Sequence, residues 1–340
     1  MLEVDIRRRQ RLAIGLALIT VLLMVAGLAA GSEGWSVVRL VQTWHGPDGI
    51  LIVGQIRAPR TLGAWLTGAL LGLAGATAQG LFRNPLADPY LLGSASGSVL
   101  GVVLVLAASA FGGHAVSVAT ADAVSRIGLV SAAFAGALAG VLLTLTLARG
   151  AQHTTRLLLA GVVVGVVLSA VSDLITTAAP DALRGKQAFL LGSTGFLGWS
   201  SCIALAMGLA VTLPPSWRLA RALDALTLGI DSARSLGIEL ARVRLALIVA
   251  LALATGLAVS QAGLIAFVGL VSPHLVRHFA PATHGFTLVA SAATGGVLLL
   301  MADVLARSLI APREIPVGVL TALLGGSYLV WLLHRRLSPS

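Results

Sequence analysis

The sequence predicts an all-α polytopic membrane protein whose residues 1–340 form a single transmembrane domain. Charged residues make up only 11% of the chain, whereas a soluble domain carries about 25%. The mean hydropathy is +0.96, and the apolar residues gather in long runs without a charge. The 39 glycines fit close helix contacts in lipid, where small residues let two backbones approach each other.

The charge-free runs predict the number of membrane spans, because a spanning helix needs roughly 20 mainly apolar residues. Runs without Asp, Glu, Lys or Arg occupy 12–31, 61–82, 89–121, 127–148, 157–172, 187–217, 245–276, 285–302 and 315–334. The run 245–276 is too long for one span, and Gln261-Ala262-Gly263 offers a turn in its middle. We therefore expect ten helices. Gly112-Gly113-His114 is expected to break the run 89–121, and Pro214-Pro215 to end the run 187–217.

The basic residues predict the orientation of the chain. A net charge of +10 on so apolar a chain indicates membrane orientation rather than nucleic-acid binding. Arginines at positions 7, 8, 9 and 11 precede the first helix, and Arg335 and Arg336 follow the last. An even number of spans puts both clusters on one side, which the positive-inside rule makes the cytoplasm. Residues 1–11 are then a cytoplasmic N-terminus, and the run 12–31, too long for a signal-peptide core, is a retained helix.

Motifs for catalysis and metal binding are missing from the sequence. The single cysteine, Cys202, excludes an intrachain disulfide and a zinc site built from several thiolates. HExxH and GxSxG do not occur, and the only lysine, Lys186, is not part of a GxxxxGK[ST] phosphate loop. Two acids, Asp173 and Asp303, lie near the ends of apolar runs. Two acidic residues are too few for a proton relay. We expect no catalytic residue, metal or cofactor in this chain, so another polypeptide must supply the energy for active transport.

The segment 217–244 is the longest charged stretch between two predicted spans, and it lies on the predicted cytoplasmic side. Apolar residues recur at helical spacing over about 219–228 and 232–241, with Gly229 between them and Asp231 or Ser232 as a possible helix cap. This pattern predicts two short helices that dock an energy-supplying partner. An amphipathic segment resting on the lipid surface is the alternative.

A series of ordered motifs runs from residue 57 almost to the C-terminus. The motifs are RAPRTLGAWLTGALLGLAGATAQGLFRNPLADPYLLG (57–93), RLLLAGVVVG (156–165), LGSTGFLGW (191–199), LDALTLGIDSARSLGI (223–238), GLIAFVGLVSPHLVRH (263–278), ADVLAR (302–307) and EIPVGVLTALLGGSYLVWLL (314–333). This set resembles the FecCD family, the permeases of bacterial ABC importers for iron-siderophores, haem and cobalamin. Gly326-Ser327-Tyr328 departs mildly from the family, which usually has a proline and a phenylalanine there.

The resemblance implies the type II ABC importer permease fold with ten transmembrane helices. It implies import of an iron complex, haem or ferric siderophore, by alternating access across the bacterial inner membrane, with both termini cytoplasmic. Cobalamin is the alternative cargo, and an ATPase-independent channel or an ion-coupled carrier is the alternative from another class. The implied partners are a second permease subunit (itself or a homologue), two ATP-binding subunits that hold ATP and Mg, a periplasmic substrate-binding protein and the lipid bilayer, without nucleic acid.

The resemblance also assigns residues at the two ends of the permease. Docking to carboxylates of the binding protein is expected at Arg57, Arg60 and Arg307, because an arginine fork holds a carboxylate with two hydrogen bonds. Interfacial arginines extending toward lipid headgroups are the alternative. Glu314 is expected near Arg307 or Arg313. Contacts with the ATPase are expected at Leu226, Gly229 and Leu236.

The stretch around Pro85 and Pro89 predicts the end of the second helix and, from the resemblance, a cytoplasmic gate. Proline lacks a backbone donor and disfavours helical geometry in the residue before it. The gate residues are expected at Asn84, Leu86, Thr154 and Thr155, with His153 beside the second pair. An ordinary cytoplasmic turn is the alternative. His274 and His278 are expected to be structural rather than metal ligands.

Overall fold

The structure is a computed structural model that describes residues 2–31, 34–35, 49–111 and 123–337. The first half of the chain folds into α1 (Leu2–Ala29), β1 (Ala30–Gly31), β2 (Gly34–Trp35), α3 (Gly49–Leu51), the π-helix η1 (Ile52–Arg57), α4 (Ala58–Phe82), α5 (Ser94–Phe111), α6 (Ala123–Leu147), α7 (Thr154–Ala178) and α8 (Pro180–Leu191). The second half forms α9 (Trp199–Arg218), α10 (Ala220–Thr227), α11 (Ile230–Ser235), α12 (Leu240–Ala262), α13 (Val268–Phe279), α14 (His284–Ser308) and α15 (Val317–Leu337). The two-residue strands β1 and β2 pair in antiparallel fashion.

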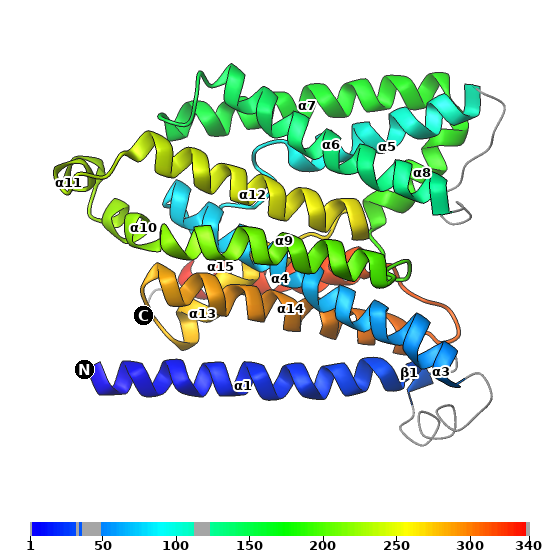
Figure 1. The fold of residues 1–340 in the computed structure, drawn as a ribbon, viewed down its shortest axis with the longest axis horizontal. Coiled ribbons are helices and arrows are strands. Elements are labelled where there is room, and N and C mark those ends of the chain that lie inside the picture. Colours follow the sequence, from blue (N-terminus) through cyan, green and yellow to red (C-terminus); the bar gives the residue numbers. More distant parts are fainter. Residues whose placement is uncertain (1, 32–33, 36–48, 112–122, 338–340) are drawn as a thin grey trace.

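The long helices lie roughly side by side, and the bundle has two distinct ends (Figure 1). Both chain termini lie at the end that carries α10 and α11, which we call the α11 end. The strand β1 and the helix α3 lie at the opposite end, which we call the α3 end. Termini at the same end agree with an even number of spans.

The ten predicted spans all contain a helix, but the helices differ in length. In the described part of the chain, seven are long and apolar enough to cross a membrane by length and composition: α1, η1 with α4, α6, α7, α9, α12 and α14. The helices α5 and α15 supply shorter apolar segments. The helix α13 has 12 residues, which at about 1.5 Å per residue do not cross a core of about 30 Å alone.

The structure confirms one predicted break and corrects another. The run 245–276 divides as expected, because α12 ends at Ala262 and Gly263 has a positive φ of 72°. The run 187–217 was expected to end at Pro214-Pro215, and this is wrong, because α9 continues through both prolines to Arg218. Proline keeps a helical φ, and the last turn is still closed by the Leu219 N–H, which donates to the Pro215 carbonyl at 3.0 Å. The predicted break at Gly112-Gly113-His114 lies outside the described residues.

The run 187–217 is interrupted instead at residues 192–198, between α8 and α9. Gly192 has a φ of 65°, and its Cβ position lies 2.5 Å from the Leu264 carbonyl oxygen, so a side chain would collide there. The sequence did not predict α8 as a separate helix, because its last residues join the following apolar run without a charge.

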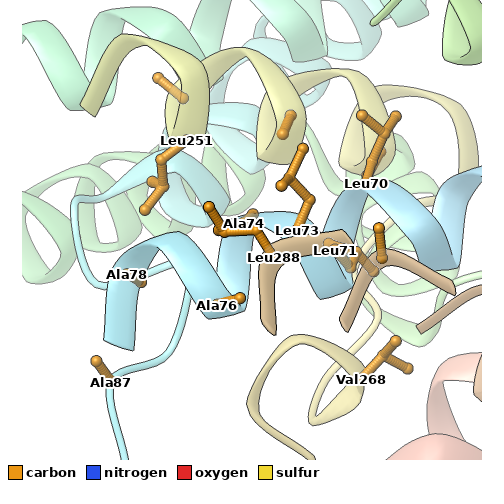
Figure 2. Close-up of a cluster of buried hydrophobic side chains, with 14 of the residues drawn as sticks. Leu70, Leu71, Leu73, Ala74, Ala76, Ala78, Ala87, Leu251, Val268 and Leu288 are labelled. Carbon is orange, nitrogen blue, oxygen red and sulfur yellow. The ribbon is translucent and has the colours of Figure 1, made fainter. Parts of the chain in front are cut away.

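The core of the molecule surrounds α4. Leu70 and Leu73 of this helix are fully buried, and Figure 2 shows α4 side chains gathered with Leu251 of α12, Val268 of α13 and Leu288 of α14. The helix α4 therefore lies in the interior of the bundle. The helix α1 lies at the edge of the bundle instead (Figure 1). Most of its apolar side chains are exposed.

Glycines allow α4 to approach α14 closely. A Cβ built on Gly72 would lie 2.1 Å from the Ser291 carbonyl oxygen, and one on Gly68 would lie 2.2 Å from the Gly295 carbonyl oxygen. Glycine also lets α5 approach α6 closely, since a Cβ built on Gly97 would lie 2.1 Å from the Gly136 carbonyl oxygen. The expectation that the glycines serve helix contacts is confirmed for these pairs.

Candidate functional site

A buried charge cluster lies at the α3 end, and we call it the Asp303 cluster. Its members are Arg60, Thr194, Asp303, Arg307 and Glu314. The Asp303 side chain is fully buried and accepts three hydrogen bonds: from Arg60 Nε at 3.1 Å, from Thr194 Oγ1 at 2.6 Å and from the Arg307 guanidinium at 2.5 Å. A buried carboxylate needs such partners, because leaving it unpaired away from water is costly.

The Asp303 cluster joins segments far apart in the sequence. The two terminal nitrogens of Arg60 donate to the two carboxylate oxygens of Glu314, each at 2.9 Å, which is the fork geometry that arginine favours. Arg307 also donates to the Gly27 carbonyl oxygen at 3.0 Å. The cluster therefore ties α1, α4 and α14 to the segments that precede α9 and α15.

The three predicted docking arginines lie at the α3 end, but each already has a partner within the chain. Arg57 donates to the Leu28 carbonyl oxygen at 3.0 Å and is half-buried. Arg60 is occupied by two carboxylates. Arg307 is 4% exposed, so it lies beneath the surface to which the sequence assigned it. Glu314 lies in the same cluster as Arg307, near which it was expected, and its ion-pair partner is Arg60.

Sequence reasoning missed the central role of Asp303 and the part of Thr194. One signal for Asp303 was present. An acid four residues before an arginine on a helix places the two side chains on the same face, as Asp303 and Arg307 are. No local signal connects Asp303 to Arg60, which is 243 residues away.

The first predicted gate segment follows α4 at the α11 end. The helix ends at Phe82, and Arg83 takes a left-handed φ of 50°. Asn84 Oδ1 accepts a hydrogen bond from the Leu86 N–H at 2.9 Å, and both side chains are exposed. Asp88 accepts a hydrogen bond from the Tyr90 N–H at 2.8 Å, and burial raises the pKa of its carboxyl group. The predicted end of the second helix is therefore confirmed, and its turn presents Asn84 and Leu86 at the surface.

The second predicted gate segment precedes α7. His153 is extended and α7 begins at Thr154, which is half-buried, while Thr155 is exposed. The buried Arg244 of α12 donates to the Gln152 carbonyl oxygen. Arg244 thus ties the segment before α7 to the start of α12.

The predicted partner-docking segment folds into two short helices, α10 and α11, as expected. Gly229 separates them and has a φ of 114°. The expected cap at Asp231 or Ser232 is wrong, because α11 begins at Ile230 without a side-chain cap.

Among the predicted ATPase contacts, Leu226 needs correction. It is fully buried in the core, because its side chain points back into the bundle. Leu236 is 65% exposed, and Leu228, which the sequence analysis did not single out, is 71% exposed. Leu228 and Leu236 are therefore the exposed large apolar side chains at α10 and α11, and Trp217, which is 56% exposed, lies just before α10.

The two histidines of α13 pack against aromatic rings. His274 lies edge-on to Tyr328 with ring centroids 5.8 Å apart, and His278 lies edge-on to Phe279 at 5.1 Å. Within the described residues, no group of three or more His, Cys, Asp or Glu side chains is arranged to hold a metal ion.

The fold and the charged segments at its ends define a multi-pass α-helical membrane protein of the type II ABC importer permease fold. Residues 18–335 match the FecCD transport family, and the chain belongs to this family. It is the permease subunit of an ABC importer. The resemblance noted in the sequence is thereby confirmed.

Relatives and a solved structure agree with this assignment. The chain is 37% identical over 341 residues to the hemin transport system permease protein HmuU of Yersinia pestis, and the match covers 97% of both chains. It is also 37% identical over 334 residues to the vitamin B12 import system permease protein BtuC of Salmonella paratyphi A, covering 97% of this chain and 96% of the relative. A putative metal-chelate type ABC transporter in an inward-facing conformation matches with a TM-score of 0.80 and 28% identity, over 96% of this chain and 99% of that one.

Proposed function

We propose that this permease moves an iron complex, haem or ferric siderophore, from the periplasm to the cytoplasm by alternating access. The observation that supports the cargo is the 37% identity to HmuU, whose name states hemin transport. Cobalamin is the second candidate, because the likeness to BtuC, whose name states vitamin B12 import, is equally high.

In the proposed orientation the α11 end faces the cytoplasm of the bacterial inner membrane and holds both termini. The clustered arginines 7, 8, 9 and 11 of α1 lie in its first turns, toward this end (Figure 1). Arg335 and Arg336 lie in the last turn of α15. This distribution supports the orientation through the positive-inside rule.

A second copy of the permease is proposed to pack along α7. Asp173 of this helix is 71% exposed, and its carboxylate pairs with Lys186 of α8. Ionisable groups on a membrane helix fit a water-filled path or a subunit interface better than lipid. The same helix exposes Leu159, Val166 and Leu174. These features support a subunit interface or transport path beside α7 and α8.

The remaining partners are proposed at the two ends. Two ATPase subunits, which bind ATP and Mg, dock at α10 and α11 through Leu228, Leu236 and the Gly229 turn. The gate of the resting permease lies at Asn84, Leu86, Thr154 and Thr155. The periplasmic binding protein docks at the α3 end, where Arg57 and Arg60 reach its carboxylates and Arg307 holds the supporting cluster.

Reconstituted vesicles test the cargo. The permease, its ATPase and its binding protein are placed in liposomes with hemin, a ferric siderophore or cobalamin. The expected result is saturable, ATP-dependent accumulation of an iron complex, with no accumulation when ATP is replaced by a non-hydrolysable analogue. Accumulation of cobalamin alone would assign the second candidate, and uphill uptake without the ATPase would contradict the proposed mechanism.

A further inference from the structure

The helix α10 is joined to the membrane-spanning body by a specific contact between Asp224 and His284. Asp224 Oδ1 accepts a hydrogen bond from the backbone N–H of His284 at 2.9 Å and lies 2.7 Å from Nδ1 of the same residue. His284 is the first residue of α14. One carboxylate oxygen therefore satisfies a free N–H at the start of α14 and also holds the imidazole ring.

The ring of His284 lies against the last turn of α4. A Cβ built on Gly80 would lie 3.0 Å from Cδ2 and 3.1 Å from Nε2 of His284. The same position would lie 3.2 Å from Cδ1 of Leu223, a fully buried residue of α10. Only a residue without a side chain lets the His284 ring and the Leu223 side chain approach the α4 backbone this closely. The helix α10 therefore contacts α4 at Gly80 through Leu223.

Gly80 lies immediately before the turn that carries Asn84. The Gly80 carbonyl oxygen accepts from the Arg83 N–H at 3.4 Å, and the Gln79 carbonyl oxygen accepts from the Asn84 N–H at 3.2 Å. The Gln79 side chain is fixed in turn, since it donates to the Leu270 carbonyl oxygen at 3.1 Å and accepts from Arg277. A displacement of the last α4 turn must therefore move the Asn84 turn with it, because packed elements transmit displacement rather than absorb it.

The α10 contact has a second support at the start of α14. The Cβ position of Gly285 lies 3.6 Å from Trp217 Nε1 and 3.8 Å from the Ala220 side chain, at the corner where α9 passes into α10. The beginning of α14 is thus held between Asp224 and this corner.

From this geometry we propose that Asp224 and His284 are positioning residues for transport, which transmit movement of α10 to Gly80 of α4 and so to the Asn84 turn. The inference rests on the proposed function, because it takes α10 and α11 as the ATPase-docking segment. Asp224 acts through His284 and touches neither the cargo nor the nucleotide.

The test compares matched variants of the permease reconstituted with its ATPase and binding protein. In Asp224→Asn the hydrogen bond to a charged acceptor is weakened, and we expect cargo moved per ATP hydrolysed to fall on the order of tenfold. The ATPase should still assemble with the permease and hydrolyse ATP. Asp5→Asn is the control, since it makes the same change on a half-buried carboxylate of α1, outside the docking segment. It should leave the amount of cargo moved per ATP unchanged.

Two substitutions at His284 separate a transmitting role from a merely structural one. His284→Phe keeps a ring against Gly80 and the backbone N–H that donates to Asp224, but it removes the imidazole contact with Asp224. It should lower the amount of cargo moved per ATP, as Asp224→Asn does. His284→Gln keeps a side-chain donor and should restore most of the ratio. Thermal unfolding of each purified variant in detergent shows whether the fold is retained.

The results of these variants distinguish a failure of this inference from a failure of the proposed function. An unchanged ratio in Asp224→Asn overturns the inference, and so does a loss of ATPase assembly in this variant, because the residue would then serve the interface itself. A fall in stability with an unchanged ratio also overturns it. If Leu228→Asn combined with Leu236→Asn leaves ATPase assembly and transport intact, then α10 and α11 are not the ATPase-docking segment. This conclusion holds whatever the result for Asp224→Asn.

Discussion

The hydroxyl of Tyr90 donates a hydrogen bond to the carbonyl oxygen of Ile265 at 3.1 Å, across 175 residues of sequence. This bond joins the chain that re-enters the bundle after α4 to the break between α12 and α13. Both segments lack regular helical hydrogen bonds, so each needs partners from elsewhere. In a membrane protein, irregular backbone is stable only where other parts of the protein satisfy it.

We predict that Tyr90→Phe destabilises the protein by about 1 kcal/mol, because the Ile265 carbonyl loses its donor. Tyr328→Phe is the control, since among the described residues the Tyr328 hydroxyl makes no hydrogen bond and its ring contacts survive the change. Thermal unfolding in detergent measures both. Equal midpoints for the two variants would mean that the Tyr90 bond adds nothing to stability.

Asp303→Asn should be among the most damaging conservative substitutions in the chain. It leaves two guanidinium groups, Arg60 and Arg307, without their shared buried charge, and breaking such a pair costs about 3–5 kcal/mol. Glu314→Gln is the matched control, because Glu314 is 45% exposed and an exposed pair contributes about 0–1 kcal/mol. The yield of folded protein and its unfolding temperature report the difference. Similar losses in both variants would contradict the central position of Asp303.

Gly72→Ala should separate α4 from α14. The new methyl group would lie 2.1 Å from the Ser291 carbonyl oxygen, a backbone atom that cannot move aside alone. Overpacking of this kind costs about 1–3 kcal/mol. Gly15→Ala on α1 is the control, because nothing lies within 4 Å of its Cβ position. Alanine also has a higher helix propensity than glycine. The two variants should therefore shift the unfolding temperature in opposite directions, and a stabilised Gly72→Ala would show that the contact is looser than described.

Leu228→Asn combined with Leu236→Asn should weaken association with the ATPase subunit by about tenfold, because exposed apolar anchors dominate such interfaces. Leu309→Asn is the control, since Leu309 is 59% exposed near the α3 end. Co-purification and titration of the labelled ATPase measure the affinity. An affinity unchanged by the double substitution would place the ATPase contact elsewhere.

Arg57→Glu should weaken docking of the binding protein at low ionic strength, and the loss should shrink as salt is added. Its side chain is bound by only one carbonyl oxygen in the described structure, so it is free to turn toward a partner more readily than Arg60. Arg11→Glu makes the same charge change on an exposed residue of α1, far from the α3 end, and serves as the control. If the unaltered permease, Arg57→Glu and Arg11→Glu all bind the binding protein with equal affinity, the proposed docking surface at the α3 end is wrong.

The sequence by itself predicted which parts of the chain form apolar helices and which family the chain belongs to. Charge-free runs specify spanning helices, because lipid excludes charge and unsatisfied backbone alike. The break at Gly263 and the two helices around Gly229 were also predictable, since glycine with a positive φ and a change of periodicity are local signals.

Only the tertiary structure decided which residues of those helices face inward and which meet each other. Leu226 and Leu228 are alike in the sequence, yet one is fully buried and the other 71% exposed. Arg60 meets Asp303 only because α4 packs against α14, whose contact is set by glycines on both helices. A helix that is apolar all round carries no stripe to mark its buried face, so packing between helices, and not hydrophobicity, selects the partners.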